Sequence, residues 1–277
     1  QFKVASKLDY GDIIVAEGAM GMTNKGEICV WADSFTLSCK SLAPPPEKFH
    51  GLNDSELRYR QRYVDMYTSQ DTIKTFKARS LIVSTIRTFM HGEGYLEVET
   101  PMMQPIAGGA AAKPFETHHN ALGIPLFLRV APELYLKRLL VGGMRKVFEI
   151  NRNFRNEGVS KRHNPEFTML ESYQAFGDCE TMLELTEGMV RASANAVGNA
   201  SAIQFGDFAI DYEKPFDRIA YGTLFEKALD CSMFDEKAIR AKASELGFGD
   251  AETKNHWLLV SDLFDAHAEQ TIEQGRP

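Results

Sequence analysis

The sequence has few cysteines, no long apolar run and no excess of positive charge. Its four cysteines lie far apart and form neither a C-x-x-C pair nor a cluster with histidine. This spacing excludes the usual zinc motifs and favours free thiols in a reducing compartment. No apolar stretch approaches the ~20 residues that span a bilayer, and the first residues lack the layout of a signal peptide. We therefore expect a cytoplasmic protein that makes no use of a membrane.

The composition is that of a globular chain. Of 277 residues, 44% are hydrophobic and 25% are charged, which is enough for one sizeable core and a smaller second unit. The formal net charge of −7 excludes a protein that is basic throughout. Any contact with nucleic acid must therefore come from a local basic patch.

Three consecutive prolines, Pro44 to Pro46, divide the chain because they stiffen it and exclude a helix. Before them, residues 12–40 contain three short strand-like segments, with a turn at Asn24, Lys25 and Gly26. We expect a small β-rich domain at 1–43, a linker at 44–53 and a larger domain at 54–277.

The larger domain opens with two expected helices. Asn53 and Glu56 suggest a capping box for a helix that ends near Met66. This helix carries three arginines that could face phosphates or form a solvated charged surface, and the pattern favours neither: Arg58, Arg60 and Arg62. The second helix, with Asp71 as its cap, covers 71–91 and is apolar at helical spacing.

The segment after these helices alternates strands, a loop and one short helix. Leu96 and Val98 alternate with glutamates in a half-buried strand that Pro101 ends. Residues 102–120 are typical of a loop, and Gly108 and Gly109 would let backbone approach a ligand. A strand at 126–130 then leads into a helix that begins at Pro132, so that Glu133 lies in its first turn.

Two charged strands, 145–157 and 166–176, form an expected antiparallel hairpin around the loop 158–165. Alternate side chains of a strand share a face, so Asn153, Arg155 and Glu157 point one way. The second strand presents one set in the same manner: Phe167, Met169, Glu171 and Tyr173. If both sets share a side, an aromatic ring, an arginine and carboxylates line one cleft, although a salt-bridged sheet face is an equal alternative.

The rest of the chain reads as helices around one short hairpin. Asp178 is expected to cap a helix that ends near Ala196, and Gly206 and Asp207 mark the hairpin turn. Three helical patterns follow, at 222–230, 235–246 and 258–272.

Four segments resemble the class II lysyl-tRNA synthetases of bacterial type. They read "GYLEVETPMM", "APELYLKRLLVGG", "FEINRNFRNEG" and "RHNPEFTMLESY". The first resembles motif 1 of that class, and the last two together resemble motif 2. The resemblance implies an α+β fold, with a mainly antiparallel catalytic sheet flanked by helices and preceded by part of an OB-fold anticodon-binding barrel. It also implies ATP-dependent activation of L-lysine and its transfer to tRNA(Lys).

The same resemblance assigns roles to individual residues. Arg155 would be catalytic, holding the lysine carboxylate and the α-phosphate. The ATP site would comprise Arg155, Glu157, His163, Asn164 and Phe167. Lysine would be bound by Gly109, Glu133, Arg155, Glu171 and Tyr173, without a decision on which carboxylate takes which ammonium group. Contacts with tRNA would come from the helix with Arg58 to Arg62, from a missing face of the OB barrel, or from Lys161 and Arg162. A homodimer would form through motif 1 and the helix 71–91, although the apolar stripe of this helix fits the buried core of a single chain equally well.

The sequence also departs from the family pattern. No segment resembles motif 3, whose arginine would cover the other face of adenine, and Mg²⁺ ligands would be expected beyond Pro277. Three strands do not close a five-stranded barrel. We therefore expect a fragment with weak ATP binding and impaired adenylate formation.

Two alternatives stay open at this point. One is a paralogue that attaches lysine to a translation factor, against which the β-rich 12–40 segment argues. The other is a non-catalytic lysine- or nucleotide-binding regulatory protein, which the missing motif 3 favours. Lysine-driven pyrophosphate exchange separates enzyme from binding protein, and charging of tRNA separates the two enzymes.

Overall fold

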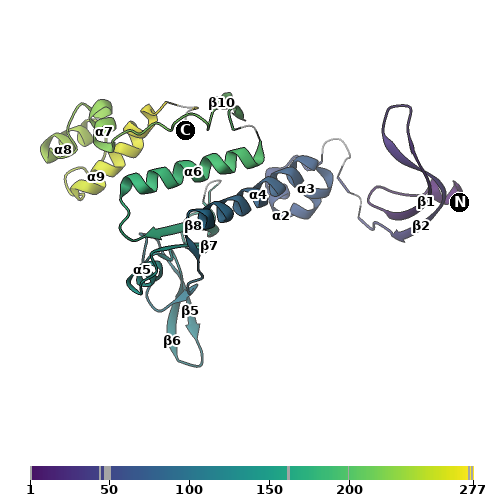
Figure 1. Cartoon of the computed structure of the whole chain (residues 1–277), viewed down its shortest axis with the longest axis horizontal. Coiled ribbons are helices and arrows are strands. Elements are labelled where there is room, and N and C mark those ends of the chain that lie inside the picture. Colours follow the sequence, from purple (N-terminus) through teal and green to yellow (C-terminus); the bar gives the residue numbers. More distant parts are fainter. Residues whose placement is uncertain are drawn as a thin grey trace. The chain divides into compact units, whose positions relative to one another are not determined.

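The computed structural model describes residues 2–43, 45–46, 51–160, 163–198, 200–273, 275 and 277. They form two compact units, Gln1–Ser80 and Leu81–Pro277 (Figure 1). Helices and strands are mixed in the α+β manner that the sequence predicts. The expected linker at 44–53 falls partly outside the described residues, and the assignment of residues 1–43 to an OB-fold stays a prediction.

The first unit contains a two-stranded antiparallel hairpin after the short helix α1 (Phe2–Ala5). Strand β1 (Ile13–Met22) pairs with β2 (Ile28–Cys39), and Gly26, at φ +83°, closes the predicted turn. The expectation of three strands is wrong, because β2 runs through Asp33 without a turn. Asp33 is instead the extra residue of a bulge, since Glu17 pairs with Ser34 while Gly18 pairs with Ala32.

The expected helix from Asn53 to Met66 is two helices. Asp54, rather than Asn53, caps α2 (Ser55–Arg60) by accepting from the backbone N–H of Leu57 at 3.1 Å. Gln61 has φ −112° and ψ 54°, outside the helical region, and α3 (Arg62–Thr68) begins after it. The next helix, α4 (Gln70–Gly92), includes Asp71 in its first turn, so Asp71 is not its cap.

A three-stranded sheet forms the centre of the second unit, in the order β3-β7-β8. Strand β7 (Lys146–Phe154) pairs antiparallel with β8 (Glu166–Gln174), as predicted. Strand β3 (Leu96–Glu97) adds a parallel edge, in which Leu96 faces Val147. The expected half-buried strand is shorter than predicted, and its Leu96 side chain is exposed.

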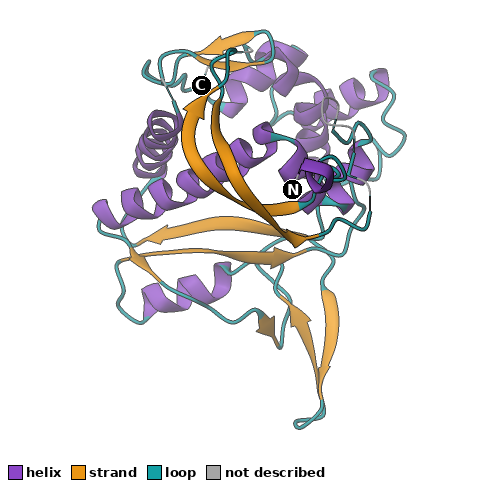
Figure 2. Ribbon diagram, turned by 90° about the vertical axis from the view of Figure 1, so that its right-hand side faces the viewer, coloured by secondary structure: helices purple, strands orange, loops and turns teal. Residues whose placement is uncertain are grey.

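Helices cover both faces of this sheet (Figures 1 and 2). On one face, Met90 of α4, Tyr95 and Phe148 form a buried cluster with side chains of β8 and of α6 (Cys179–Val197). Asp178 caps α6 in a capping box with Thr181, which confirms the prediction. On the other face lies α5 (Glu133–Val141), preceded by Pro132.

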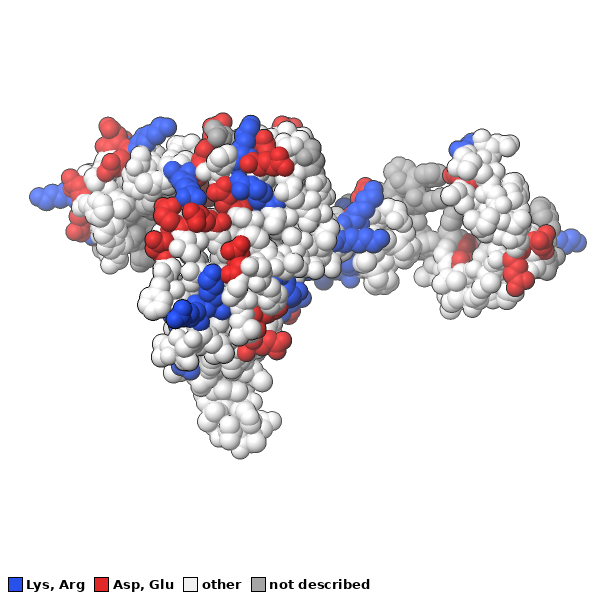
Figure 3. Space-filling model, viewed as in Figure 1, with Lys and Arg blue, Asp and Glu red and all other residues white. Residues whose placement is uncertain are grey.

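A second three-stranded sheet takes two of its strands from residues 102–120, so the prediction of a continuous loop there is wrong. Its order is β4-β6-β5, with β4 (Met103–Gln104), β5 (Phe115–His119) and β6 (Ile124–Leu128) all antiparallel. The glycine and alanine run at 108–112 separates β4 from β5 and suggested a continuous loop. The arm formed by β5 and β6 is nearly free of Lys, Arg, Asp and Glu (Figure 3).

The C-terminal part is a hairpin followed by helices that share a core. Strands β9 (Ile203–Phe205) and β10 (Phe208–Ile210) meet at Gly206, with φ +58°, as predicted. The helices that follow are α7 (Tyr221–Leu229), α8 (Glu236–Glu245), α9 (His256–Leu263), the π-helix η1 (Phe264–Ala268) and the 3₁₀-helix η2 (Glu269–Thr271). Phe225, Ile239 and Leu259 are among the side chains fully buried between them.

None of the helices described here combines the length and apolar character needed to cross a membrane.

Candidate active site

One face of the β7–β8 hairpin gathers the side chains that the sequence assigns to a site. Residues directly opposite each other in an antiparallel pair share a face. The pairs on this face are Asn153 with Phe167, Asn151 with Met169, Glu149 with Glu171, and Val147 with Tyr173. The predicted convergence of Phe167, Glu171 and Tyr173 on one surface is therefore confirmed, whereas Glu157, the second predicted carboxylate, lies beyond the end of β7.

Arg155 lies beyond the end of β7 but on the same side as Phe167. Its backbone N–H donates to the carbonyl of Pro165 at 2.8 Å, and its guanidinium carbon lies 5.2 Å from the centroid of the Phe167 ring. The expectation that the strand continues to Glu157 is wrong. It ends at Phe154, because the N–H of Asn156 turns away to the carbonyl of Lys113 at 2.7 Å.

A cavity of about 450 Å³ opens at this end of the hairpin. The five residues predicted to bind ATP all line it, together with Gly158 and Pro165: Arg155, Glu157, His163, Asn164 and Phe167. His163 is held by its Nδ1, 2.8 Å from the Ser160 hydroxyl. Lys161 and Arg162, predicted to contact tRNA, lie outside the described residues.

The buried Nε of Arg155 has no hydrogen-bond partner among the described atoms. An unpartnered buried donor of a charged group is costly unless a ligand or water satisfies it. Beside a cavity, this donor fits an anionic ligand such as a phosphate or carboxylate, which a guanidinium binds through parallel hydrogen bonds.

Acidic groups occupy the opposite end of the same face. The Tyr173 hydroxyl donates to Glu171 Oε2 at 2.9 Å, and both side chains are partly buried. Burial raises the pKa of Glu171, the hydrogen bond from Tyr173 opposes this, and the charge of Glu133 raises it further. Burial and the bonded Glu171 carboxylate also raise the pKa of Tyr173, so its hydroxyl stays a donor at neutral pH.

Glu133 and Gly109 meet beside this acidic end. Gly109 has φ +88°, and a Cβ placed there would lie 3.1 Å from the Cβ atoms of Ala131 and Glu133. Only glycine fits this approach without strain. The Glu133 carboxylate accepts from the ammonium of Lys137, one helical turn away, at 2.5 Å. Glu133 is therefore already placed to receive an ammonium group, and its partner is more than half exposed.

A buried ion pair that sequence reasoning missed lies beneath the acidic end. Arg129 Nη1 donates to Glu149 Oε1 at 2.7 Å, and both side chains are fully buried. Glu149 also accepts from the Thr100 hydroxyl at 2.6 Å and from Asn151 Nδ2 at 3.1 Å. A single charge inside each apolar run, "LFLRVA" and "VFEI", was the available signal, since buried charges are rarely unpaired.

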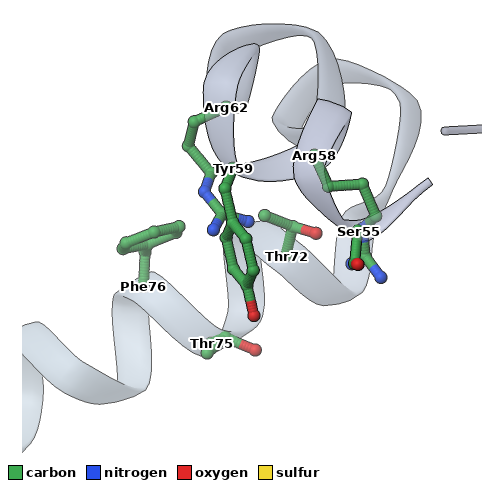
Figure 4. A pocket seen from close by; sticks show the side chains of 7 residues that line it. All are labelled: Ser55, Arg58, Tyr59, Arg62, Thr72, Thr75 and Phe76. Carbon is green, nitrogen blue, oxygen red and sulfur yellow. The ribbon is translucent and has the colours of Figure 1, made fainter. Parts of the chain in front are cut away.

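The three arginines expected to contact tRNA separate into two groups. Arg58 and Arg62 line a cavity of about 280 Å³ within the first unit, and Figure 4 shows Arg62 between the Tyr59 and Phe76 rings. Arg60 instead forms an exposed ion pair with Glu56 at 3.1 Å.

Asp65 holds the two arginines of this cavity in place. Its carboxylate accepts from Arg58 Nε and from Arg62 Nη1, each at 2.8 Å, and from the Thr72 hydroxyl at 3.0 Å. Burial acts to raise the pKa of Asp65, but these hydrogen bonds outweigh it and lower the pKa. The cluster thus keeps two cations around one anion and has a net positive charge.

The described part of the chain brings no three His, Cys, Asp or Glu side chains together in a way that could hold a metal ion. The four cysteines are free thiols.

Known proteins resemble this chain along nearly its whole length. It is 51% identical to the lysine-tRNA ligase of Carboxydothermus hydrogenoformans over 274 residues. This matched region covers 98% of this chain and 56% of that protein. It is 48% identical to the lysine-tRNA ligase of Staphylococcus epidermidis and 47% identical to that of Staphylococcus aureus, in each case over 99% of this chain and 56% of the other. The chain thus spans about half the length of these relatives.

A family comparison covers the larger part of the chain. Residues 54–267 match the family described as tRNA synthetases class II (D, K and N). This range includes both ends of the hairpin site and the helices that cover its sheet. With that match, and with the arginine, aromatic and acidic residues placed on one face, the chain belongs to the class II tRNA synthetases of the D, K and N group.

Proposed function

We propose that a protein containing this chain is a lysine-tRNA ligase of the cytoplasm, which activates L-lysine with ATP and transfers it to tRNA(Lys). One observation carries the proposal. A single face of the β7–β8 hairpin presents Arg155 over Phe167 at one end and Glu171 bonded to Tyr173 at the other. The relatives named lysine-tRNA ligase support the choice of amino acid.

The arginine end suits the nucleotide and the reacting atoms. Phe167 offers a ring on which adenine can stack, and the buried Arg155 Nε offers an unused donor. In adenylate formation the lysine carboxylate attacks the α-phosphorus, and pyrophosphate leaves with the bonding electron pair. Negative charge accumulates on the phosphoryl oxygens as this happens. A fixed guanidinium stabilises that charge more than it stabilises the ground state.

The acidic end suits the two ammonium groups of lysine. Glu133 already accepts from an ammonium, that of Lys137, and Glu171 is partly buried and accepts a hydrogen bond from Tyr173. Phe167 and Glu171 are four residues apart on an extended strand, so the aromatic end and the acidic end of the face are separated by roughly 13 Å. An amino acid lacking the side-chain amine would leave a carboxylate buried and unpaired, and such a site rejects it strongly.

Lysine-dependent exchange between ATP and pyrophosphate tests the proposal. We expect exchange to require lysine and to be negligible with norleucine, which has a similar length but no side-chain amine. Charging of tRNA(Lys) by the same protein would then exclude ligation to a translation factor. A protein that binds lysine and ATP but gives no exchange would be a binding protein and would refute the proposal.

We further propose that Arg58 and Arg62 contact the tRNA backbone. The support is their cavity with two aromatic rings and the net positive charge left around Asp65. Basic side chains also gather over α2 and α3 in Figure 3. Replacing both by glutamine should weaken tRNA binding. The slope of the binding constant against salt concentration, on logarithmic axes, should fall by the amount expected for about two lost phosphate contacts. Arg60→Gln is the matched control. It removes one exposed arginine and its ion pair with Glu56, and it should leave tRNA binding near wild type.

A homodimer through the region of α4 and β3 completes the proposal. Leu81, Leu96 and Met103 are exposed apolar side chains in this region, as expected of a surface that a partner covers. Sedimentation equilibrium measures the oligomeric state. We expect the wild-type protein to be a dimer and Leu96→Asp to dissociate into monomers. A wild-type protein that stays monomeric at micromolar concentration would exclude it.

A further inference from the structure

The buried ion pair of Arg129 and Glu149 lies directly under the acidic end of the site. Glu149 is opposite Glu171 in the hairpin, and Arg129 follows β6 and reaches across to Glu149 at 2.7 Å. Arg129 is also fixed by its Nε, which donates to the carbonyl of Arg152 at 2.8 Å. The pair therefore ties the β7 strand to the segment that leads into α5 and Glu133.

Two further carboxylates, Glu133 and Glu149, act on Glu171 through their charge. Glu149 and Glu171 are cross-strand neighbours, and like charges in this relation repel each other. Glu133 contributes a third negative charge from α5, with Lys137 as its exposed partner. Arg129 is the cation buried among them, and its Nη2 has no partner among the described atoms.

Fold stability alone does not account for such a pair. Replacing a buried ion pair by apolar side chains of similar volume is often neutral or stabilising, because both charges lose their hydration when buried. What the pair does change is the field at Glu171. The charge of Arg129 lowers the pKa of the Glu171 carboxyl, and the charge of Glu149 raises it, although burial remains the largest influence.

We propose that Arg129 and Glu149 are positioning residues of the lysine site: the guanidinium neutralises Glu149, so that Glu171 keeps its negative charge for the ammonium group of the ligand. The inference rests on the proposed function for its ligand. Neither residue touches lysine. They act through Glu171, by balancing charge beneath it and by fixing the strand that faces it.

Single and double substitutions give opposite signatures under this proposal. In Arg129→Met, Glu149 and Glu171 face each other without a cation, so the pKa of Glu171 should rise further. Lysine binding should weaken about tenfold and recover as the pH rises. In Glu149→Gln, the uncompensated arginine repels the ammonium, so binding should weaken without recovery at high pH. The double variant restores the charge balance and should bind within about threefold of wild type.

The measurement is calorimetric lysine binding between pH 6 and 8.5, with unfolding of each variant followed in parallel. Thr100→Val is the control for lost hydrogen bonding, because it keeps the side-chain volume and removes the 2.6 Å bond to Glu149 and the 3.0 Å bond from Arg129 without changing any charge. Arg152→Met is the control for charge, since its exposed ion pair with Glu166 belongs to the opposite face of the same hairpin. Neither control should change the pH profile.

Carboxyl NMR titration of Glu171 in wild type and Arg129→Met gives a readout that needs no ligand. An upward shift of its titration supports the charge balance even if the protein fails to bind lysine, in which case only the proposed function fails. Lysine binding with the same pH profile in all variants would overturn the inference and leave the function intact. A double variant that binds worse than both single variants would also overturn it, because a purely structural pair predicts accumulating losses.

Discussion

The two long antiparallel hairpins of the molecule, β1–β2 and β7–β8, have the same pairing but opposite surroundings. Within its own unit β1–β2 is open to solvent, and Ile28 and Trp31 are more than half exposed. In β7–β8, Val147, Phe148 and Glu149 are essentially fully buried. Strand pairing alone therefore decides neither stability nor function. Both depend on the helices and loops that pack against each face of the hairpin.

The covered hairpin divides its two faces between these tasks. Phe148 and Ile150 pack on one side against α4 and α6, and this burial stabilises the sheet. The other side bears Glu149, Glu171 and Tyr173, whose polar groups would be costly without partners. The apolar face thus holds the charged face in position. The described residues of its own unit cover neither face of the β1–β2 hairpin, and isolated hairpins are marginally stable.

The largest expected effect tests this difference in cover. Phe148→Ala removes a fully buried ring and should lower the free energy of unfolding of the second unit by about 3–5 kcal/mol. Trp31→Ala, in the open hairpin, should cost less than about 1 kcal/mol. Denaturant unfolding, followed by probes specific to each unit, measures both. Equal losses would show that β1–β2 is covered as well.

The next effect concerns the end of β7–β8 that meets the cavity. Arg155→Lys keeps the charge but loses the planar fork over Phe167, so lysine-dependent pyrophosphate exchange should fall about 10²–10³-fold. Arg152→Lys, an exposed position on the opposite face of the same strand, is the control and should stay near wild type. Activity retained by Arg155→Lys would mean that this face does not carry the chemistry.

A smaller effect is expected at the acidic end. Because the pKa of Glu171 is raised, wild-type lysine binding should decline as the pH falls through a value above the ordinary carboxyl range. Glu171→Gln should weaken binding by about tenfold or more and remove this inflection. Glu166→Gln, exposed on the other face of β8, should leave both affinity and pH profile unchanged. Titration calorimetry over pH measures the three proteins.

Features set by local chemistry were predictable from the sequence. The β7–β8 pairing, the cap at Asp178 and the turn at Gly206 each depend on residues close together in the chain. Placement of Phe167 and Tyr173 on one face followed from strand periodicity alone. The resemblance in motif 2 then gave these positions their predicted roles, which stay predictions for the individual residues.

Features set by distant residues were not predictable in the same way. Arg129 and Glu149 are 20 residues apart, and nothing local says that one charge neutralises the other. The bulge at Asp33 had the composition of a turn, and only the register of its partner strand distinguishes the two. The break between α2 and α3 at Gln61 depends on its backbone angles, which the pattern of side chains did not predict.

The smallest expected effect weakens the cover of β7–β8 without changing its strands. Asp178 caps α6, and hydrogen bonds from the backbone and side chain of Thr181 lower the pKa of its carboxyl. Asp178→Ala should lower the unfolding midpoint of the second unit by roughly 2–4 °C at pH 7. A depressed pKa means that the contribution is complete above the ordinary carboxyl pKa of about 3.9 and is lost as the pH falls further. The difference from wild type should therefore shrink in acid, whereas Asp54→Ala, which uncaps α2, should leave this transition unmoved at every pH. A constant difference across pH would mean that Asp178 acts through its shape and not through its charge.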